Sequence, residues 1–359
     1  MYIKNKVLRF AIFIIFVLLI IYLSSKVNFV FQPLLSLIQV VAIPFMLAVF
    51  FYYLIRPLVR YMAKYRINRT ASILLIYLLF ALALVWFSAS QWPRLQEQLV
   101  SFLNNIPNLF HELGERINEL EQSGFLSSLF PEGASPLSSV TDYLNKGLAL
   151  LTNSVGGVVS FVSDFTVVLF TFPILLFFML KEEGKLGKRI AGAAPTRFQD
   201  DTRSIITEID QMLSGFIIGR VLINLALGVL MYFGFILIDL PYAFLLTAVA
   251  VIANFVPFIG AILSAIPIVI VGLTQSPSTA IWSLVIILVA QQIQDNLVAP
   301  YVFGKSLDIH PLTTIILVLA AGDIGGIIGM IIVIPLYMIL KIIAVRVFTL
   351  FFKDKWMQL

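Results

Sequence analysis

Long apolar runs separated by short polar segments dominate this chain, and their lengths predict helices that cross a membrane. The runs occupy residues 10–23, 33–55, 70–92, 155–180, 212–238, 242–273, 279–298 and 311–341. About 20 mostly apolar residues suffice for a helix to cross the hydrocarbon core of a bilayer. The pattern therefore predicts an all-α, polytopic membrane protein with about eight transmembrane helices.

Helix-breaking residues interrupt the apolar runs of the C-terminal half. The run 242–273 contains Asn254, Pro257 and Gly260, so it forms either one broken helix or two half-helices, and it either spans or re-enters the membrane. Several glycines near residue 326 either allow close helix packing or form a flexible segment. Non-helical backbone is tolerated at membrane depth where it lines a cavity or is buried in protein. We therefore expect broken or re-entrant helices along a pathway.

Polar side chains inside the last apolar runs are the candidates for that pathway. They are Arg220, Asn254, Gln291, Gln294, Asp295, Asn296 and Asp323, with helix breaks at Pro257, Gly260 and Pro300. Charges at membrane depth are costly and usually pair or line water. With a rise of about 1.5 Å per residue, Arg220 and Asp323 fall near the middle of the membrane and Asp295 nearer the outer face. This predicts an ion pair between Arg220 and Asp323; alternatively, Arg220 reaches to the cytoplasmic face and Asp323 lies in a wet cavity.

Residues 93–153 form a long stretch without an apolar run. Their charges are mainly acidic and their apolar positions recur at helical spacing, which predicts an external helical segment, with Pro107 beginning its second helix. The segment either caps the bundle or the lipid surface, or contacts another subunit. It separates three N-terminal transmembrane helices in residues 1–92 from a C-terminal transmembrane core in residues 154–359, which carries the candidate site.

The composition agrees with a membrane protein and excludes several other classes. Of the 359 residues, 60% are hydrophobic and 12% are charged, whereas a soluble domain has about 25% charged residues. There is no cysteine, which excludes disulfides and thiol chemistry. The two histidines are too few for an ordinary histidine metal site, so no cofactor is expected. The net charge of +5 is distributed over loop ends and forms no stripe that would bind nucleic acid.

Basic residues predict the orientation of the chain. The segment between the second and third runs contains five basic residues and no acidic one: Arg56, Arg60, Lys64, Arg66 and Arg69. Short cytoplasmic loops of membrane proteins are rich in Lys and Arg. This segment is therefore expected to be cytoplasmic, as are the N- and C-termini.

Catalytic motifs are missing from the apolar runs. They contain neither an H-E-x-x-H motif nor a plausible Ser–His pair. Asp295 and Asp323 lie on neighbouring helices, as do the two aspartates of intramembrane aspartyl proteases. However, Ala320 stands where the G-x-G-D motif of those proteases requires glycine, and Gln294 stands where they have tyrosine. We therefore predict that the protein is not an enzyme.

Several spaced motifs resemble those of the autoinducer-2 exporter family, a group of PerM-like bacterial permeases. They are Pro257-Phe258-Ile259-Gly260 with Pro267, Gln294-Asp295-Asn296 with Pro300 and Gly304, and the series Pro311, Gly322, Gly326, Gly329 and Pro335. The resemblance covers nearly the whole chain and implies transport in a bacterial plasma membrane by a homo-oligomer. It makes Asp295, Asn296 and Pro257 the best candidates for the transport site. Arg220 and Asp323 depart from the family pattern, in which glutamine and a small or apolar residue are more usual, so a member's substrate cannot simply be transferred to this chain.

The resemblance leaves two transport activities open. In sodium(lithium)/proton antiport, Asp295 or Asp323 would exchange a proton for a monovalent cation. In export of a small polar solute such as autoinducer-2, the amides of residues 291–296 would form hydrogen bonds with its hydroxyl groups, and the proline breaks would act as gates. A structural or developmental membrane protein without transport activity is a third alternative. The expected partners are a small polar solute or a cation with protons, the lipid bilayer and further copies of the chain, but no nucleic acid.

Overall fold

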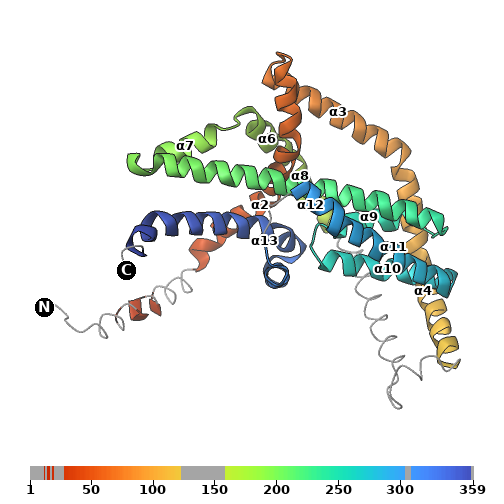
Figure 1. Ribbon diagram of the computed structural model, residues 1–359. Helices are drawn as coiled ribbons and strands as arrows, with labels where there is room; N and C mark the ends of the chain where they lie inside the picture. Colours follow the sequence, from red (N-terminus) through yellow and green to blue (C-terminus); the bar gives the residue numbers. More distant parts are fainter. Residues whose placement is uncertain are drawn as a thin grey trace. The chain divides into compact units, whose positions relative to one another are not determined.

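The computed structural model describes residues 12, 14–16, 18–19, 28–122, 158–303 and 309–356, and the elements in these residues are helices (Figure 1). They are α2 (Asn28–Lys64), α3 (Arg69–Ser90), α4 (Trp92–Gln122), α6 (Val158–Lys181), α7 (Lys185–Ala193), η1 (Thr196–Phe198), α8 (Gln199–Leu237), α9 (Ala243–Ala253), α10 (Ile259–Gln275), α11 (Pro277–Ile293), the π-helix η2 (Gln294–Val298), α12 (Ala299–Phe303) and α13 (Pro311–Trp356). The all-α prediction is thereby confirmed for this part of the chain. Most of the predicted first span and the second half of the 93–153 segment lie outside the described residues.

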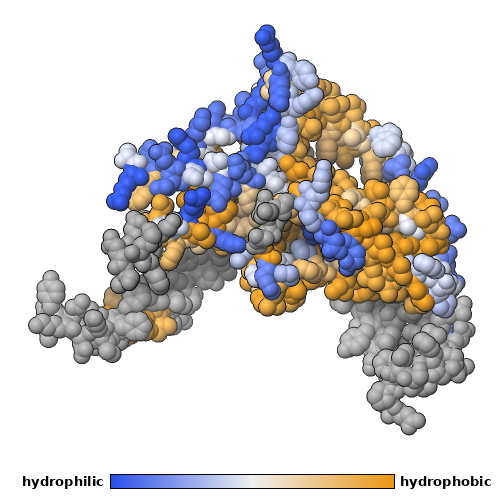
Figure 2. All heavy atoms as spheres, in the orientation of Figure 1, coloured by the Kyte–Doolittle hydropathy of each residue, from blue (hydrophilic) through white to orange (hydrophobic). Residues whose placement is uncertain are grey.

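Five helices in the described residues are long and apolar enough to cross a membrane. They are Val40–Lys64, Arg69–Ser90, Thr196–Leu237, Pro277–Phe303 and Pro311–Leu350. They correspond to the predicted second, third, fifth, seventh and eighth spans, while the total of eight crossings stays a prediction. Figure 2 shows a broad hydrophobic surface in the region of α9, α10 and α11, as expected for helices that face lipid or another subunit.

The helices form two compact units. The first comprises Met1–Tyr52 and Phe161–Met179, and the second comprises Tyr53–Ser160 and Leu180–Leu359. Every candidate site residue lies in the second unit, so the geometry of the candidate site is contained in one unit.

Helices α9 and α10 form an antiparallel pair. The beginning of α9 and the end of α10 both lie at the C-terminal end of α8. Gln275, the last residue of α10, donates a hydrogen bond from Nε2 to the carbonyl oxygen of Asp239, in the turn after α8, at 3.0 Å. Helix α9 returns along α8, and its 11 residues are only about 16 Å long. The apolar run 242–273 is thus two half-helices.

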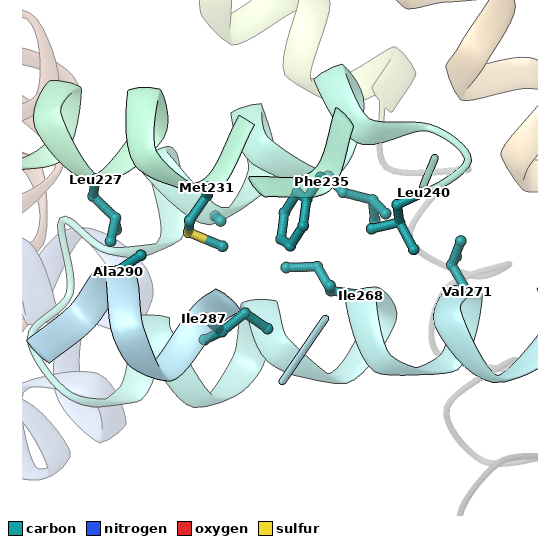
Figure 3. Close-up of a cluster of buried hydrophobic side chains, with 10 residues drawn as sticks. Leu227, Met231, Phe235, Leu240, Ile268, Val271, Ile287 and Ala290 are labelled. Carbon is teal, nitrogen blue, oxygen red and sulfur yellow. The ribbon is translucent and has the colours of Figure 1, made fainter. Parts of the chain in front are cut away.

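A hydrophobic core holds this pair against its neighbours (Figure 3). It consists of Leu227, Met231 and Phe235 of α8, Leu240, Leu246 and Ala250 in and before α9, Ile268 and Val271 of α10, and Ile287 and Ala290 of α11. The α8 members recur every four residues, so they line one face of that helix. Because lipid is as apolar as these side chains, close packing rather than removal from water stabilises the contact.

The turn between the two half-helices depends on Gly260. A Cβ at this position would lie 1.8 Å from the carbonyl oxygen of Ala253, the last residue of α9. Phe258, directly before α10, has a φ of 63°, a strained conformation for a residue with a side chain. The helix breaks predicted at Pro257 and Gly260 therefore form a tight turn between two helices, not a kink within one helix.

A second chain reversal occurs inside α13. Gly326 is non-helical, with φ 58° and ψ −150°. A Cβ on Gly329 would lie 2.4 Å from the carbonyl oxygen of Ala321, whereas these residues would be about 12 Å apart in one continuous helix. The eighth predicted span therefore turns back on itself at Gly326, and its glycines serve both the turn and the close approach of its two arms.

Helix α4 runs through Pro107, so the prediction that this residue begins a second helix was wrong. The helix contacts the beginning of α9. Asn105 Nδ2 donates to the hydroxyl oxygen of Tyr242 at 3.2 Å, and Gln98 Oε1 accepts from the backbone N–H of Leu245 at 3.2 Å. The described half of the 93–153 segment thus packs on the α9–α10 pair.

Arginines from the basic segment form an ion-pair network with two acidic residues. Arg56 Nη1 donates to both carboxylate oxygens of Asp210, at 2.6 and 2.8 Å. Glu183, in the turn between α6 and α7, pairs with Arg60 at 2.6 Å and also with Arg69. The network joins the end of α2, the beginning of α3 and the first part of α8, so these arginines have a structural role besides their topological one.

We expect the substitution Gly260→Ala to destabilise the fold. The new methyl group would overlap the Ala253 carbonyl, and overpacking of this kind costs about 1–3 kcal/mol. Thermal unfolding in detergent should show a melting temperature several degrees lower. The control is Gly215→Ala in α8, where a Cβ would meet nothing within 4 Å. Equal melting temperatures for the two variants would contradict the tight turn.

We expect Glu183→Gln to lower the stability by about 2 kcal/mol, less than the 3–5 kcal/mol of a fully buried pair because Arg60 is exposed. The substitution leaves the arginines crowded around a neutral side chain. Glu182→Gln is the matched control, because its carboxylate is exposed and lies 3.8 Å from Lys185. The check is chemical denaturation of both variants. If Glu183→Gln lowers the free energy of unfolding no more than Glu182→Gln does, the network does not contribute to stability.

Candidate functional site

Three amide side chains meet where the turn of the α9–α10 pair reaches α8 and the end of α11. Asn254 Nδ2 donates to Asn224 Oδ1 at 3.3 Å and to Gln294 Oε1 at 2.9 Å. The exposed fractions are 1% for Asn224, 4% for Asn254 and 6% for Gln294. A buried polar group without a partner costs about 1–3 kcal/mol. These bonds therefore fix the turn between the two helices.

Arg220 adds a permanent positive charge to these amides. It lies one helical turn before Asn224 on α8, and its Nη2 donates to the backbone carbonyl oxygen of Asn254. This carbonyl lies at the C-terminal end of α9, where the helix dipole is negative. The Nε of Arg220 is buried and has no hydrogen-bond partner among the described residues.

Asp295 supplies a negative charge nearby. Its Oδ1 accepts a hydrogen bond from Gln294 Nε2 at 3.2 Å, and its charge attracts that of Arg220 without direct contact. We refer to Arg220, Asn224, Asn254, Gln294 and Asp295 as the tip cluster. It combines one fixed cation, one carboxylate and three amides at the meeting point of α8, η2 and the α9–α10 turn.

The π-helix η2 positions Gln294 and Asp295 and has a local cause. Pro300 lacks an N–H, and its ring would clash with the carbonyl of Asn296 in an ordinary α-helix. The helix widens instead, and the N–H of Ala299 donates to the carbonyl of Gln294, five residues earlier. Pro300 therefore widens the helix but does not end it, and the chain continues as α12.

The sequence pointed to most of the tip cluster. Arg220, Asn254, Gln294 and Asp295 were candidates, and the turn that contains Pro257 and Gly260 lies directly beside them. Asn224 was missed as a site residue. A usable signal was present, because residues four apart on a helix share a face and Asn224 follows Arg220 by four.

The other candidates lie elsewhere. Gln291 is half-buried, almost one turn before Gln294. Asn296 is exposed and donates from Nδ2 to Gln292 Oε1 at 2.7 Å, away from the buried amides. Pro300 is exposed. Asp323 is exposed too, three residues before the reversal of α13.

The predicted ion pair between Arg220 and Asp323 does not form. Arg220 donates to Asn254, and Asp295 is the acidic group whose charge acts on it. The prediction placed Asp295 near the outer face because it assumed that run 242–273 crosses the membrane. Helix α11 instead begins where α8 ends, so Asp295 and Arg220 each lie about 17–18 residues from that end and fall at the same level.

A cavity of about 520 Å³ lies between α8, α12 and α13. Its walls are largely apolar and include Phe216 and Phe303, whose rings stack with centroids 6.3 Å apart. Glu208 and Arg346 form an exposed ion pair at its rim, at 2.8 Å. A Cβ on Gly219 would lie 2.5 Å from the Phe303 ring, so the cavity approaches Arg220, the next residue along α8.

We expect Asn254→Leu to destabilise the protein by about 1–3 kcal/mol, because it leaves buried oxygens of Asn224 and Gln294 without a donor. Asn296→Leu removes the same chemical group from an exposed position and should cost far less. Thermal unfolding of both variants checks this. If Asn296→Leu is the more harmful change, Asn254 does not organise the cluster.

Known proteins resemble this chain along most of its length. Residues 10–348 match the family described as AI-2E family transporter. The chain is 35% identical to the "Putative transport protein YueF" of Bacillus subtilis, over 94% of this chain and 92% of that protein. It is 26% identical to the "Putative permease PerM" of Escherichia coli K12, over 75% and 74% of the two chains. It is 21% identical to a sodium-lithium/proton antiporter of Halobacillus andaensis, over 81% and 85%. The family is one of membrane transporters rather than enzymes, and this chain belongs to the AI-2E transporter family.

Proposed function

We propose that the chain moves a small polar solute across a bacterial plasma membrane and that the tip cluster binds this solute. The tip cluster itself carries the proposal: its three amides are buried, Arg220 is partly buried and Asp295 is exposed. It gathers amide donors and acceptors with the end of a half-helix, α9, in an otherwise apolar bundle. Broken helices of transporters place such groups at the substrate site.

The proposed pathway runs along α8. Because both ends of the α9–α10 pair lie at one end of α8, the pair would re-enter the membrane without crossing it. The arginine network of Arg56 lies toward the other end of α8, which the positive-inside rule assigns to the cytoplasm together with both termini. The cavity beside Phe303 would then lead from the cytoplasm toward the tip cluster. The protein would act as a homo-oligomer, as the family resemblance implies.

Antiport of sodium or lithium against protons is the second candidate function. Two observations favour it: one relative is named as such an antiporter, and Asp295 provides a carboxylate in the tip cluster. The charge of Arg220 opposes it, because like charges in a poorly solvated site repel each other strongly. Solute transport is therefore the better supported function.

Proteoliposomes distinguish the two functions. We expect the wild-type protein to release a labelled, hydroxylated polar solute, and Asn254→Leu to abolish the release. Addition of sodium or lithium to acid-loaded vesicles should give no dequenching of a pH dye. Dequenching that is lost in Asp295→Asn would establish antiport instead, and the absence of both signals would favour a protein without transport activity.

A further inference from the structure

Arg220 contacts the carbonyl at the C-terminal end of a half-helix, a position at which a metal cation could also bind. The backbone carbonyl of Asn254 accepts a hydrogen bond from Arg220. The amide oxygens of Asn224 and Gln294 belong to the same cluster and accept from the Asn254 side chain, and the carboxylate of Asp295 accepts from Gln294. Carbonyl, amide and carboxylate oxygens are the preferred ligands of hard cations. In transporters with broken helices, the C-terminal ends of half-helices coordinate the coupling ion.

The guanidinium of Arg220 occupies this position at the C-terminal end of α9. It donates to the carbonyl at the end of α9, where an ion would otherwise be attracted by the helix dipole. Unlike a dissolved ion, it cannot leave, and a guanidinium does not lose its proton in a protein. The charge of Asp295 attracts it without direct contact.

We propose that Arg220 is a built-in cation that takes the place of a sodium or lithium ion in the tip cluster and makes solute transport independent of both ions. The inference deepens the proposed function and rests on it for the part that concerns transport. Arg220 also restricts the class of solute. Its charge favours neutral or anionic solutes, and its buried Nε is available to donate to a solute oxygen.

The first test is binding and needs no transport. The substitution Arg220→Gln removes the charge but retains an N–H donor for the Asn254 carbonyl. Thermal unfolding of the purified protein in detergent is measured in sodium, lithium or choline chloride at equal ionic strength. We expect sodium or lithium to raise the melting temperature of Arg220→Gln by a few degrees at concentrations about a hundredfold above the dissociation constant. The wild type should respond equally to all three salts.

Three variants control this experiment. Arg220→Lys keeps the charge and should behave as the wild type. Arg203→Gln removes an exposed arginine from the same helix and should create no response to either ion. Arg220→Ala, purified in sodium or lithium, provides a second charge-free protein if Arg220→Gln does not fold, and it should lose stability when the ion is exchanged for choline.

The outcomes separate this inference from the proposed function. Stabilisation by sodium or lithium in the charge-free variants alone supports the built-in cation. Three results would overturn it: sodium or lithium stabilises the wild type to the same extent, neither ion stabilises any variant, or choline stabilises the variants as well. In proteoliposomes, the ratio of solute release with sodium or lithium to release without them should be at least tenfold higher for Arg220→Gln than for the wild type. A wild type that moves no solute would refute the proposed function and leave the binding result to decide the inference.

Discussion

The hydrogen bond from Arg220 to the carbonyl of Asn254 is the contact on which the site depends. A half-helix that stops inside an apolar bundle leaves its last carbonyl groups without helical partners, and lipid cannot supply any. The guanidinium satisfies one of these groups and is favourably placed at the negative end of the helix dipole. The side chain of the same residue, Asn254, binds Asn224 and Gln294, so one residue connects three helices.

Local features around this contact serve the same geometry. Gly260 allows the two half-helices to approach each other closely, since any side chain there would overlap α9. Pro300 widens the end of α11 into a π-helix, which includes Gln294 and Asp295. Glycine and proline thus act here as conformational requirements, and the polar residues provide the chemistry.

The charged residues form two separate groups with different roles. Near the beginning of α8, Glu183 and Asp210 compensate several arginines in an ordinary structural network. In the tip cluster, a single arginine donates to one backbone carbonyl oxygen and is attracted by the charge of one carboxylate that it does not contact. The first group stabilises the positions of helix ends. In the second, the Nε of Arg220 is buried without a hydrogen-bond partner among the described residues.

The sequence by itself determined the class of protein, the positions of most helices in the described residues and the breaks at Pro257 and Gly260. It also identified Arg220, Asn254, Gln294 and Asp295, because polar side chains in apolar runs are conspicuous. It could not determine which of these residues meet. The depth of a residue in the membrane depends on the direction in which every preceding helix runs.

Only the tertiary structure showed that the α9–α10 pair returns to its starting end and that α13 reverses at Gly326. These two reversals bring Asp295 to the level of Arg220 and place Asp323 elsewhere. Hydrophobic periodicity indicates which face of a single helix is buried. Which residues of different helices touch depends on backbone turns and on close packing between distant segments.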